Sequence, residues 1–150
     1  MKSTMFIFTC LSLLICSCNF STKKTALNSS ENAHNSENSL DWPGIYSGIL
    51  PCTDCEGMRE TVIHIRMDGS FIMNVKHLGE SDESVMTVGT IEWNNKGNTI
   101  TLNGNDENVS PAKYFVGEGQ LFYLDANGNR FLGDSADKYI LRKVDESLVF

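Results

Sequence analysis

Residues 61–78 have the sequence Thr-Val-Ile-His-Ile-Arg-Met-Asp-Gly-Ser-Phe-Ile-Met-Asn-Val-Lys-His-Leu, and this stretch decides the fold class. Apolar and polar side chains alternate on both sides of Asp68-Gly69, a pair typical of tight hairpin turns. The faces predicted to contribute to the core carry Thr61, Ile63, Ile65 and Met67 before the turn and Phe71, Met73 and Val75 after it, with His77 at the end of the second face. The stretch therefore predicts an antiparallel hairpin.

The same alternation recurs through the rest of the chain after residue 42. It predicts further strands over residues 45–50, 85–93, 99–102, 114–116, 120–124, 130–132 and 139–142. No window of the sequence repeats apolar residues at helical spacing over three turns. Short strands about ten residues apart, joined by Gly- and Asn-rich turns, favour an all-β antiparallel barrel of about eight to ten strands, because closure removes exposed edges. We expect this barrel over residues 41–150.

The first 17 residues are typical of an export signal. Lys2 precedes an apolar segment that is too short to span a bilayer. The segment ends in Leu14-Ile15-Cys16-Ser17-Cys18, which resembles a bacterial lipobox with Cys18 as the lipidated residue. An ordinary secretory signal is the alternative. Asn19 is not the aspartate that favours inner-membrane retention, so we expect an anchor in the outer membrane, facing the periplasm or the cell surface.

Residues 18–40 are expected to form a disordered tether. They are rich in Ser, Asn, Thr, Glu and Lys and contain too few apolar residues to offset the chain entropy lost on folding. The whole chain has a formal net charge of −7. A surface this acidic argues against nucleic acid as a partner, because proteins that bind phosphate backbones concentrate Lys and Arg.

Cys52 and Cys55 form a Cys-x-x-Cys pair that follows a predicted strand and Pro51. Two of four interpretations fit poorly. A thioredoxin-like redox site places the pair at a helix N-terminus, whereas here strands flank it and the Asp54 carboxylate opposes thiolate formation. A structural zinc site requires four ligands, usually from two such pairs, and the sequence contains one.

The other two interpretations stay open. The first is a plain Cys52–Cys55 disulfide, although so short a loop removes little entropy from the unfolded chain. The second is a soft-metal site for Cu(I), which two thiolates can bind with help from a thioether. Met58 lies three residues after Cys55 and is the candidate third ligand.

The remaining soft ligands have simpler explanations. Met67 and Met73 occupy positions predicted to face the core and are expected to pack there. His34 lies in the tether and is expected to be solvated, whereas His64 and His77 are expected at the surface or at a pocket rim. The sequence contains no Gly-x-Ser-x-Gly, phosphate-binding glycine loop or His-Glu-x-x-His motif, so we do not expect an enzyme.

Residues 44–57 contain the pattern Gly-x-Tyr-x-Gly-x-Leu-Pro-Cys-x-Asp-Cys-x-Gly, which resembles the signature of the NlpE N-terminal domain family of copper-resistance lipoproteins. Similar features follow at residues 68–71, 89–93 and 139–141. The resemblance implies a lipocalin-like β-barrel on an outer-membrane lipoprotein. It also implies a role for Cys52 and Cys55 in copper tolerance or in signalling to an envelope-stress protein. Signalling members have a second, cysteine-containing domain that these 150 residues do not include, so we do not expect a mechanism that depends on it.

Overall fold

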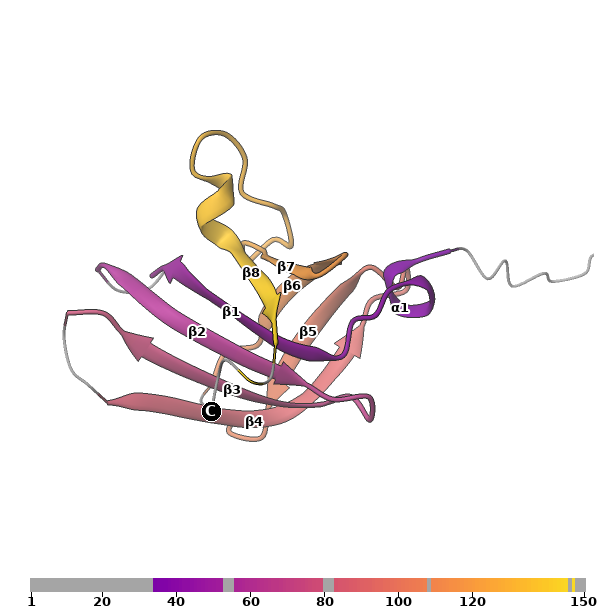
Figure 1. Ribbon diagram of the computed structural model, residues 1–150, viewed down its shortest axis with the longest axis horizontal. Helices are drawn as coiled ribbons and strands as arrows, with labels where there is room; N and C mark the ends of the chain where they lie inside the picture. The colour runs from indigo at the N-terminus through magenta and orange to yellow at the C-terminus, as the bar shows by residue number, and fades with distance from the viewer. Residues whose placement is uncertain (1–33, 53–55, 80–82, 108, 146, 148–150) are drawn as a thin grey trace, which may run out of the picture.

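The chain forms a closed antiparallel barrel of eight strands in the order β1-β2-β3-β4-β5-β6-β7-β8 (Figure 1). The computed structural model describes residues 34–52, 56–79, 83–107, 109–145 and 147. The strands are β1 Gly44–Pro51, β2 Met58–Ile65, β3 Ser70–His77, β4 Ser84–Trp93, β5 Thr99–Gly104, β6 Ala112–Gly117, β7 Gln120–Tyr123 and β8 Ile140–Val144. One α-helical turn, α1 Ser36–Ser39, precedes them, and a 3-10 turn, η1 Ala136–Tyr139, precedes β8. The predicted all-β barrel is confirmed.

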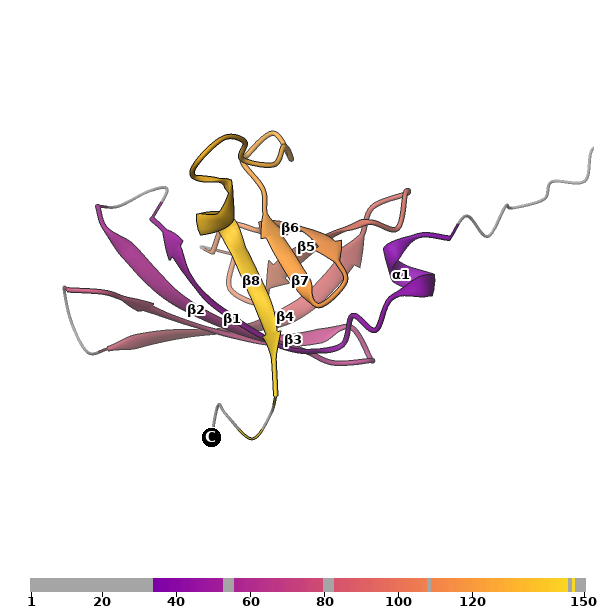
Figure 2. The ribbon, with the colours of Figure 1, turned by 45° about the horizontal axis from the view of Figure 1, so that its top comes forward.

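The barrel has one long and one short wall. Strands β1 to β3 contain 8 residues each and β4 contains 10, whereas β5 to β8 contain between 4 and 6. Figures 1 and 2 show the long strands running on past the short ones at the end where β1 leads to β2. We call this end the mouth. The inner face of the long wall therefore extends beyond the opposite wall there.

The β2–β3 hairpin forms as predicted around Asp68-Gly69. Its turn is closed by hydrogen bonds from the Arg66 amide to the Ser70 carbonyl (2.9 Å) and from the Gly69 amide to the Arg66 carbonyl (3.0 Å). Gly69 has a φ of +79°, which glycine adopts without strain. The expectation that Met67 faces the core is wrong: β2 ends at Ile65, and Met67 lies in the turn with 86% of its surface exposed.

Two glycines allow neighbouring strands to approach closely. A Cβ at Gly89 would lie 2.0 Å from the carbonyl oxygen of Asn103 on the paired strand β5, and a Cβ at Gly48 would lie 2.9 Å from the carbonyl oxygen of Ile140. Contacts this short are not tolerated by a side chain. Gly48 and Gly89 are therefore required at the bends where β1 meets β8 and β4 meets β5.

The core fills the barrel from the end opposite the mouth up to Leu50, the penultimate residue of β1. Alternate residues of each strand point inward, as the period of two requires. The buried cluster consists of Tyr46, Leu50, Ile63, Ile65, Phe71, Ile100, Leu102, Tyr114, Val116, Leu121 and Leu141. Met73 packs against this cluster, in agreement with the prediction made from the sequence.

Residues 34–43, which we call the N-terminal strap, cover the end of the barrel opposite the mouth (Figure 2). The Ser36 hydroxyl donates to the Val116 carbonyl (2.7 Å), and the Glu37 amide donates to the Gly97 carbonyl (3.0 Å). Leu40 and Trp42 pack against the core cluster. The prediction of a disordered tether to residue 40 is thus wrong for residues 34–40, because these backbone groups find partners on the barrel; residues 18–33 lie outside the described residues.

Two further details differ from the sequence prediction. Residues 130–132 form no strand, since Arg130 makes only an isolated bridge to Leu124. The segment instead belongs to the long connection between β7 and β8. None of the helices in the described ranges has the length and apolar character needed to cross a membrane.

Candidate functional site

Cys52 lies at the mouth, one residue beyond the end of β1. Its amide donates to the carbonyl of Gly57 (3.1 Å), and Gly57 has a φ of +96°, so the chain turns back tightly into β2. Cys52 is disulfide-bonded. Cys55, the other half of the predicted pair, lies outside the described residues.

Met58 lies close to Cys52 along the wall but on the other side of it. Met58 pairs with Pro51 in the β1–β2 register, and both alternate with the inward pair Leu50 and Arg59. Its thioether therefore belongs to the outer face of β2, as does Pro51, whereas Cys52, the residue directly after Pro51, takes the next position of the alternation, on the inner side. A metal ion bound by both sulfurs would therefore have to lie at the edge of this wall, at the mouth.

The three histidines are far apart in the fold. His34 is exposed in the strap, with its Nδ1 3.5 Å from the Ser39 hydroxyl. His64 is on the outer face of β2 between Ile45 and Ile72, and His77 occupies an inward position on β3 opposite Arg59. Within the part of the chain that the structure describes, no three His, Cys, Asp or Glu side chains gather as a metal site requires.

The inner face of the long wall carries a cation near the mouth. Arg59 is half-buried, and its guanidinium lies over the ring of Tyr123 on the opposite wall, 5.5 Å from the centroid. Its positive charge also acts on Tyr114: burial raises the pKa of Tyr114, and the charge of Arg59 opposes this rise. Arg59 thus brings positive charge into the barrel.

Thr61 is one inward position deeper than Arg59 on β2. The residue is 1% exposed, and its hydroxyl has no hydrogen-bond partner among the described residues. Our sequence prediction counted Thr61 as a core residue and did not identify Arg59 as inward-facing. The strand begins at Met58 rather than at Thr61, and extending the alternation two residues toward the N-terminus would have revealed Arg59.

Aromatic rings line the short wall opposite Arg59. The rings of Tyr123 and Phe131 are nearly parallel, at 8°, with centroids 6.3 Å apart. Phe131 in turn stacks on Tyr139 with a centroid distance of 3.6 Å. Because Phe131 and Tyr139 come from the β7–β8 connection, this stack fixes that connection against the barrel.

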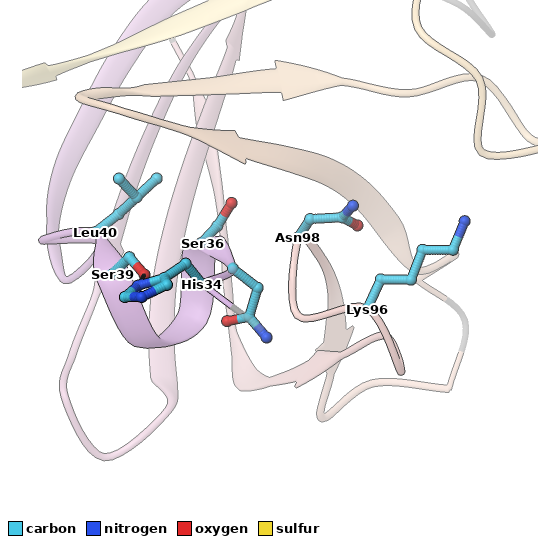
Figure 3. Close-up of a pocket in the computed structure, with 7 residues that line it drawn as sticks. His34, Ser36, Ser39, Leu40, Lys96 and Asn98 are labelled. Carbon is cyan, nitrogen blue, oxygen red and sulfur yellow. Dashed lines mark hydrogen bonds between the residues drawn. The ribbon is translucent and has the colours of Figure 1, made fainter. Parts of the chain in front are cut away.

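A separate pocket lies between the strap and the turn joining β4 to β5. Figure 3 shows His34, Ser36 and Ser39 on one side of it and Lys96 and Asn98 on the other. The Asn35 side chain, which also lines it, packs against Gly97, where a Cβ would overlap it at 2.3 Å. This pocket lies at the contact between the strap and the barrel, and it is remote from Cys52.

Comparison with known proteins gives consistent matches. The family described as the NlpE N-terminal domain matches residues 46–134. The lipoprotein NlpE of Escherichia coli strain K12 is 32% identical over 109 residues, which is 71% of this chain and 43% of that protein. The chain thus spans less than half the length of this relative.

Solved structures show the same fold. The crystal structure of a candidate lipoprotein from Shewanella oneidensis is 41% identical, with a TM-score of 0.63, and the match covers 73% of this chain and 95% of that one. The crystal structure of the Cpx pathway activator NlpE from Escherichia coli is 29% identical, with a TM-score of 0.50, covering 61% of this chain and 46% of that one.

Proposed function

Because this chain belongs to the NlpE N-terminal domain family, we propose that it is a non-enzymatic lipoprotein of the outer membrane that senses envelope stress through Cys52 and Cys55. Family membership carries this proposal: the matched relative in Escherichia coli is described as a Cpx pathway activator. Cys18 is the proposed site of lipidation and attaches the chain to the membrane. The partner is an envelope stress-signalling protein.

In this proposal, copper binding depends on whether Cys52 is held in a disulfide. A thiolate is the metal ligand, and a sulfur held in a disulfide does not supply one. Copper therefore binds only after Cys52 and Cys55 are reduced, as Cu(I) held by the two thiolates, with Met58 as the proposed third ligand. In this scheme, Cys52 and Cys55 respond only when conditions are reducing and copper is present.

A second function is favoured by the same observation. If Cys52 and Cys55 form a permanent disulfide, the pair stiffens the turn between β1 and β2, and the barrel acts by binding a ligand or a partner protein. Mass spectrometry of the chain purified without reductant, with and without thiol alkylation, separates the two. Resistance to alkylation in the folded protein under mild reductant supports the permanent disulfide, and ready alkylation supports the sensor.

Copper binding is tested on the reduced chain. We expect one Cu(I) per molecule by competition with a chromogenic chelator, and loss of that ion in Cys52→Ser/Cys55→Ser. Met58→Leu should weaken binding without abolishing it, and Met67→Leu, at the opposite end of the barrel, is the matched control. Equal copper binding by the double serine variant would exclude the two cysteines as ligands.

Signalling is tested in Escherichia coli cells that lack their own NlpE and carry a Cpx-responsive reporter. We expect overproduction of this chain to raise the reporter and Cys18→Ala to prevent it, because a buried acyl chain contributes about 0.8 kcal/mol per methylene to membrane binding. A reporter that does not respond to the wild-type chain, when immunoblotting shows it in the outer-membrane fraction, would rule out this signalling role.

A further inference from the structure

Strand β4 is paired on both sides over only half of its length. It pairs with β5 from Gly89 to Trp93 (Figure 1). The segment from Ser84 to Val88 pairs with β3 alone among the described residues. The Asn105 amide donates to the Val88 carbonyl (2.9 Å) at the point where the chain leaves β5. Residues 84–88, which we call the β4 edge, are therefore an open strand edge at the mouth.

The register shows which backbone groups face outward along this edge. The N–H and C=O of one residue point to the same side of a strand, and successive residues alternate. Because the Val88 carbonyl faces the side of β5, the backbone groups of Ser84 and Met86 face that side too, and those of Val85 and Thr87 face β3. Outward-facing N–H and C=O groups on a strand edge are a template for pairing with another chain.

The side chains of the β4 edge are apolar and exposed on both faces. Val85 pairs with Val75 and faces inward, yet it is 60% exposed. Met86 and Val88 face outward and are 67% and 40% exposed. Natural proteins protect their edge strands with charged residues and proline, but residues 84–91 contain neither. An uncharged apolar edge of this kind is typical of a surface that another chain covers.

Carboxylates flank the β4 edge at both ends. Glu83 is exposed and directly precedes Ser84. Glu107 is also exposed, and it lies two residues after Asn105, which contacts the Val88 carbonyl. A second copy of this chain, paired antiparallel, would place Glu83 of one copy beside Glu107 of the other, and like charges oppose such a contact. A chain with basic residues at both ends of an apolar stretch would instead complement the edge.

We propose that the β4 edge binds an extended segment of a partner protein by strand addition, and that this segment consists of alternating apolar residues with a Lys or Arg at each end. The backbone of the segment hydrogen-bonds to Ser84 and Met86. Its apolar side chains on the inner face contact Val85, and its basic ends pair with Glu83 and Glu107. The proposal does not rest on the proposed function, because it involves neither cysteine.

The test uses the peptide fluorescein-Lys-Val-Thr-Val-Thr-Val-Lys-amide and the chain from residue 18 to residue 150 produced without lipid. We expect fluorescence anisotropy to rise saturably with one peptide bound per chain, and the affinity to fall as salt is added. Two control peptides should bind about tenfold more weakly or worse: one with Glu in place of both Lys, and one N-methylated at alternate residues, which cannot pair with a strand edge. Equal binding by either control would overturn the proposal.

Amide hydrogen exchange, followed by NMR on the nitrogen-15-labelled chain, locates the bound peptide. The amides of Val85 and Thr87 already face β3, so their exchange should change little. Those of Ser84 and Met86 face the open side and should exchange more slowly when the peptide is bound. Unchanged exchange at both Ser84 and Met86 at saturating peptide would refute strand addition at this edge.

Two substitutions at exposed positions test the side chains without disturbing the core. Met86→Lys places a positive charge on the edge and should weaken binding about tenfold. Met67→Lys, at a methionine that is 86% exposed at the opposite end of the barrel, is its control. Glu83→Lys should weaken binding about threefold, and Glu118→Lys, in the turn after β6, is the control with the same change in net charge. Equal effects of a variant and its control would contradict the site.

Self-pairing of the β4 edge is tested by sedimentation equilibrium without peptide. We expect a monomer. A dimer that Met86→Lys dissociates would assign the edge to a second copy of the chain and overturn the proposal. Cys52→Ser/Cys55→Ser should bind the peptide as the wild type does, so a failure of copper binding with retention of peptide binding would overturn the proposed function and leave this inference intact.

Discussion

Trp42 and Trp93 meet edge to face, with ring centroids 5.6 Å apart and planes at 75°. Trp42 belongs to the N-terminal strap, and Trp93 is the last residue of β4, so one aromatic contact joins segments 51 positions apart in the sequence. The indole N–H of Trp42 also donates to the Glu37 carbonyl (3.1 Å). Trp42 thus stabilises both the strap itself and its contact with the barrel.

Replacing Trp42 by alanine should lower the free energy of unfolding by about 2 kcal/mol, somewhat less than for a fully buried tryptophan. Urea unfolding followed by circular dichroism measures this. Asp41→Ala is the matched control, since it removes only the ion pair with Lys143, whose carboxylate side is 89% exposed. Its expected effect is below about 1 kcal/mol. Equal losses in the two variants would contradict the role given to Trp42.

Gly89→Ala should prevent closure of the barrel between β4 and β5. The added methyl would meet the Asn103 carbonyl oxygen, which is backbone and unable to rotate away. We expect a loss of about 3 kcal/mol or more, the upper range for overpacking. Thr90→Ala, the adjacent exposed position, should cost less than about 1 kcal/mol. A stable Gly89→Ala protein with wild-type melting temperature would show that the two strands can separate there.

Alkaline pH should unfold the protein in a defined interval. Burial, assisted by the negative charge of Asp41, raises the pKa of Tyr46 to about 12 from its ordinary value of 10.0. The folded state thus holds this proton more tightly than the unfolded state, so its contribution to stability is complete below pH 10 and is lost as the pH rises toward 12. Burial also raises the pKa of Tyr114, which acts in the same direction.

Circular dichroism and tyrosinate absorbance should therefore change together between pH 10 and pH 12. In Tyr46→Phe, part of this pH dependence should disappear. The same variant should lose about 1 kcal/mol at neutral pH, because the Tyr46 hydroxyl donates to the Trp42 carbonyl (2.6 Å). Complete ionisation of all tyrosines near pH 10 in the folded protein would contradict the burial of Tyr46.

Arg130→Gln should loosen the connection between β7 and β8. The Arg130 guanidinium lies over the Phe122 ring at 3.7 Å from its centroid and over Phe115 at 5.6 Å. Arg130 is itself exposed, and an exposed cation over an aromatic ring contributes about 0.5–1 kcal/mol. Arg142→Gln, at an exposed position on β8, is the control. Faster amide hydrogen exchange at residues 125–135 in Arg130→Gln alone would confirm the effect.

The barrel was predictable because its strands alternate strictly, and one-sided burial leaves an alternating strand only one orientation. The ends of the strands were less predictable. Met67 continues the apolar alternation beyond Ile65, yet a tight turn needs Arg66 and Ser70 to pair, and this removes Met67 from the strand. Arg59 was missed for the opposite reason, since a charged residue at an inward position interrupts the pattern that identifies strands.

The strap was not predictable from composition. Its serines and asparagines resemble those of a disordered segment, but the Ser36 hydroxyl and the Glu37 amide meet carbonyl groups of Val116 and Gly97, more than 50 residues away in the sequence. The pairing of β5 with β6 brings these carbonyls together, since the Val116 amide donates to the Asn98 carbonyl (2.9 Å). The disulfide bond of Cys52 was one of two interpretations left open, since spacing alone does not distinguish a disulfide from a pair of thiolate ligands.

The strap also determines where mechanical load would enter the molecule. A pull applied at residue 34 would act first on the hydrogen bonds of Ser36 and Glu37 and then on the Trp42–Trp93 contact. These are few and can break one after another, whereas the ladder of β1 with its two neighbours would have to break together. Under tension, the strap would therefore detach from the barrel first and release several residues of extended chain. Cys52, at the far end of β1, would experience force only after that.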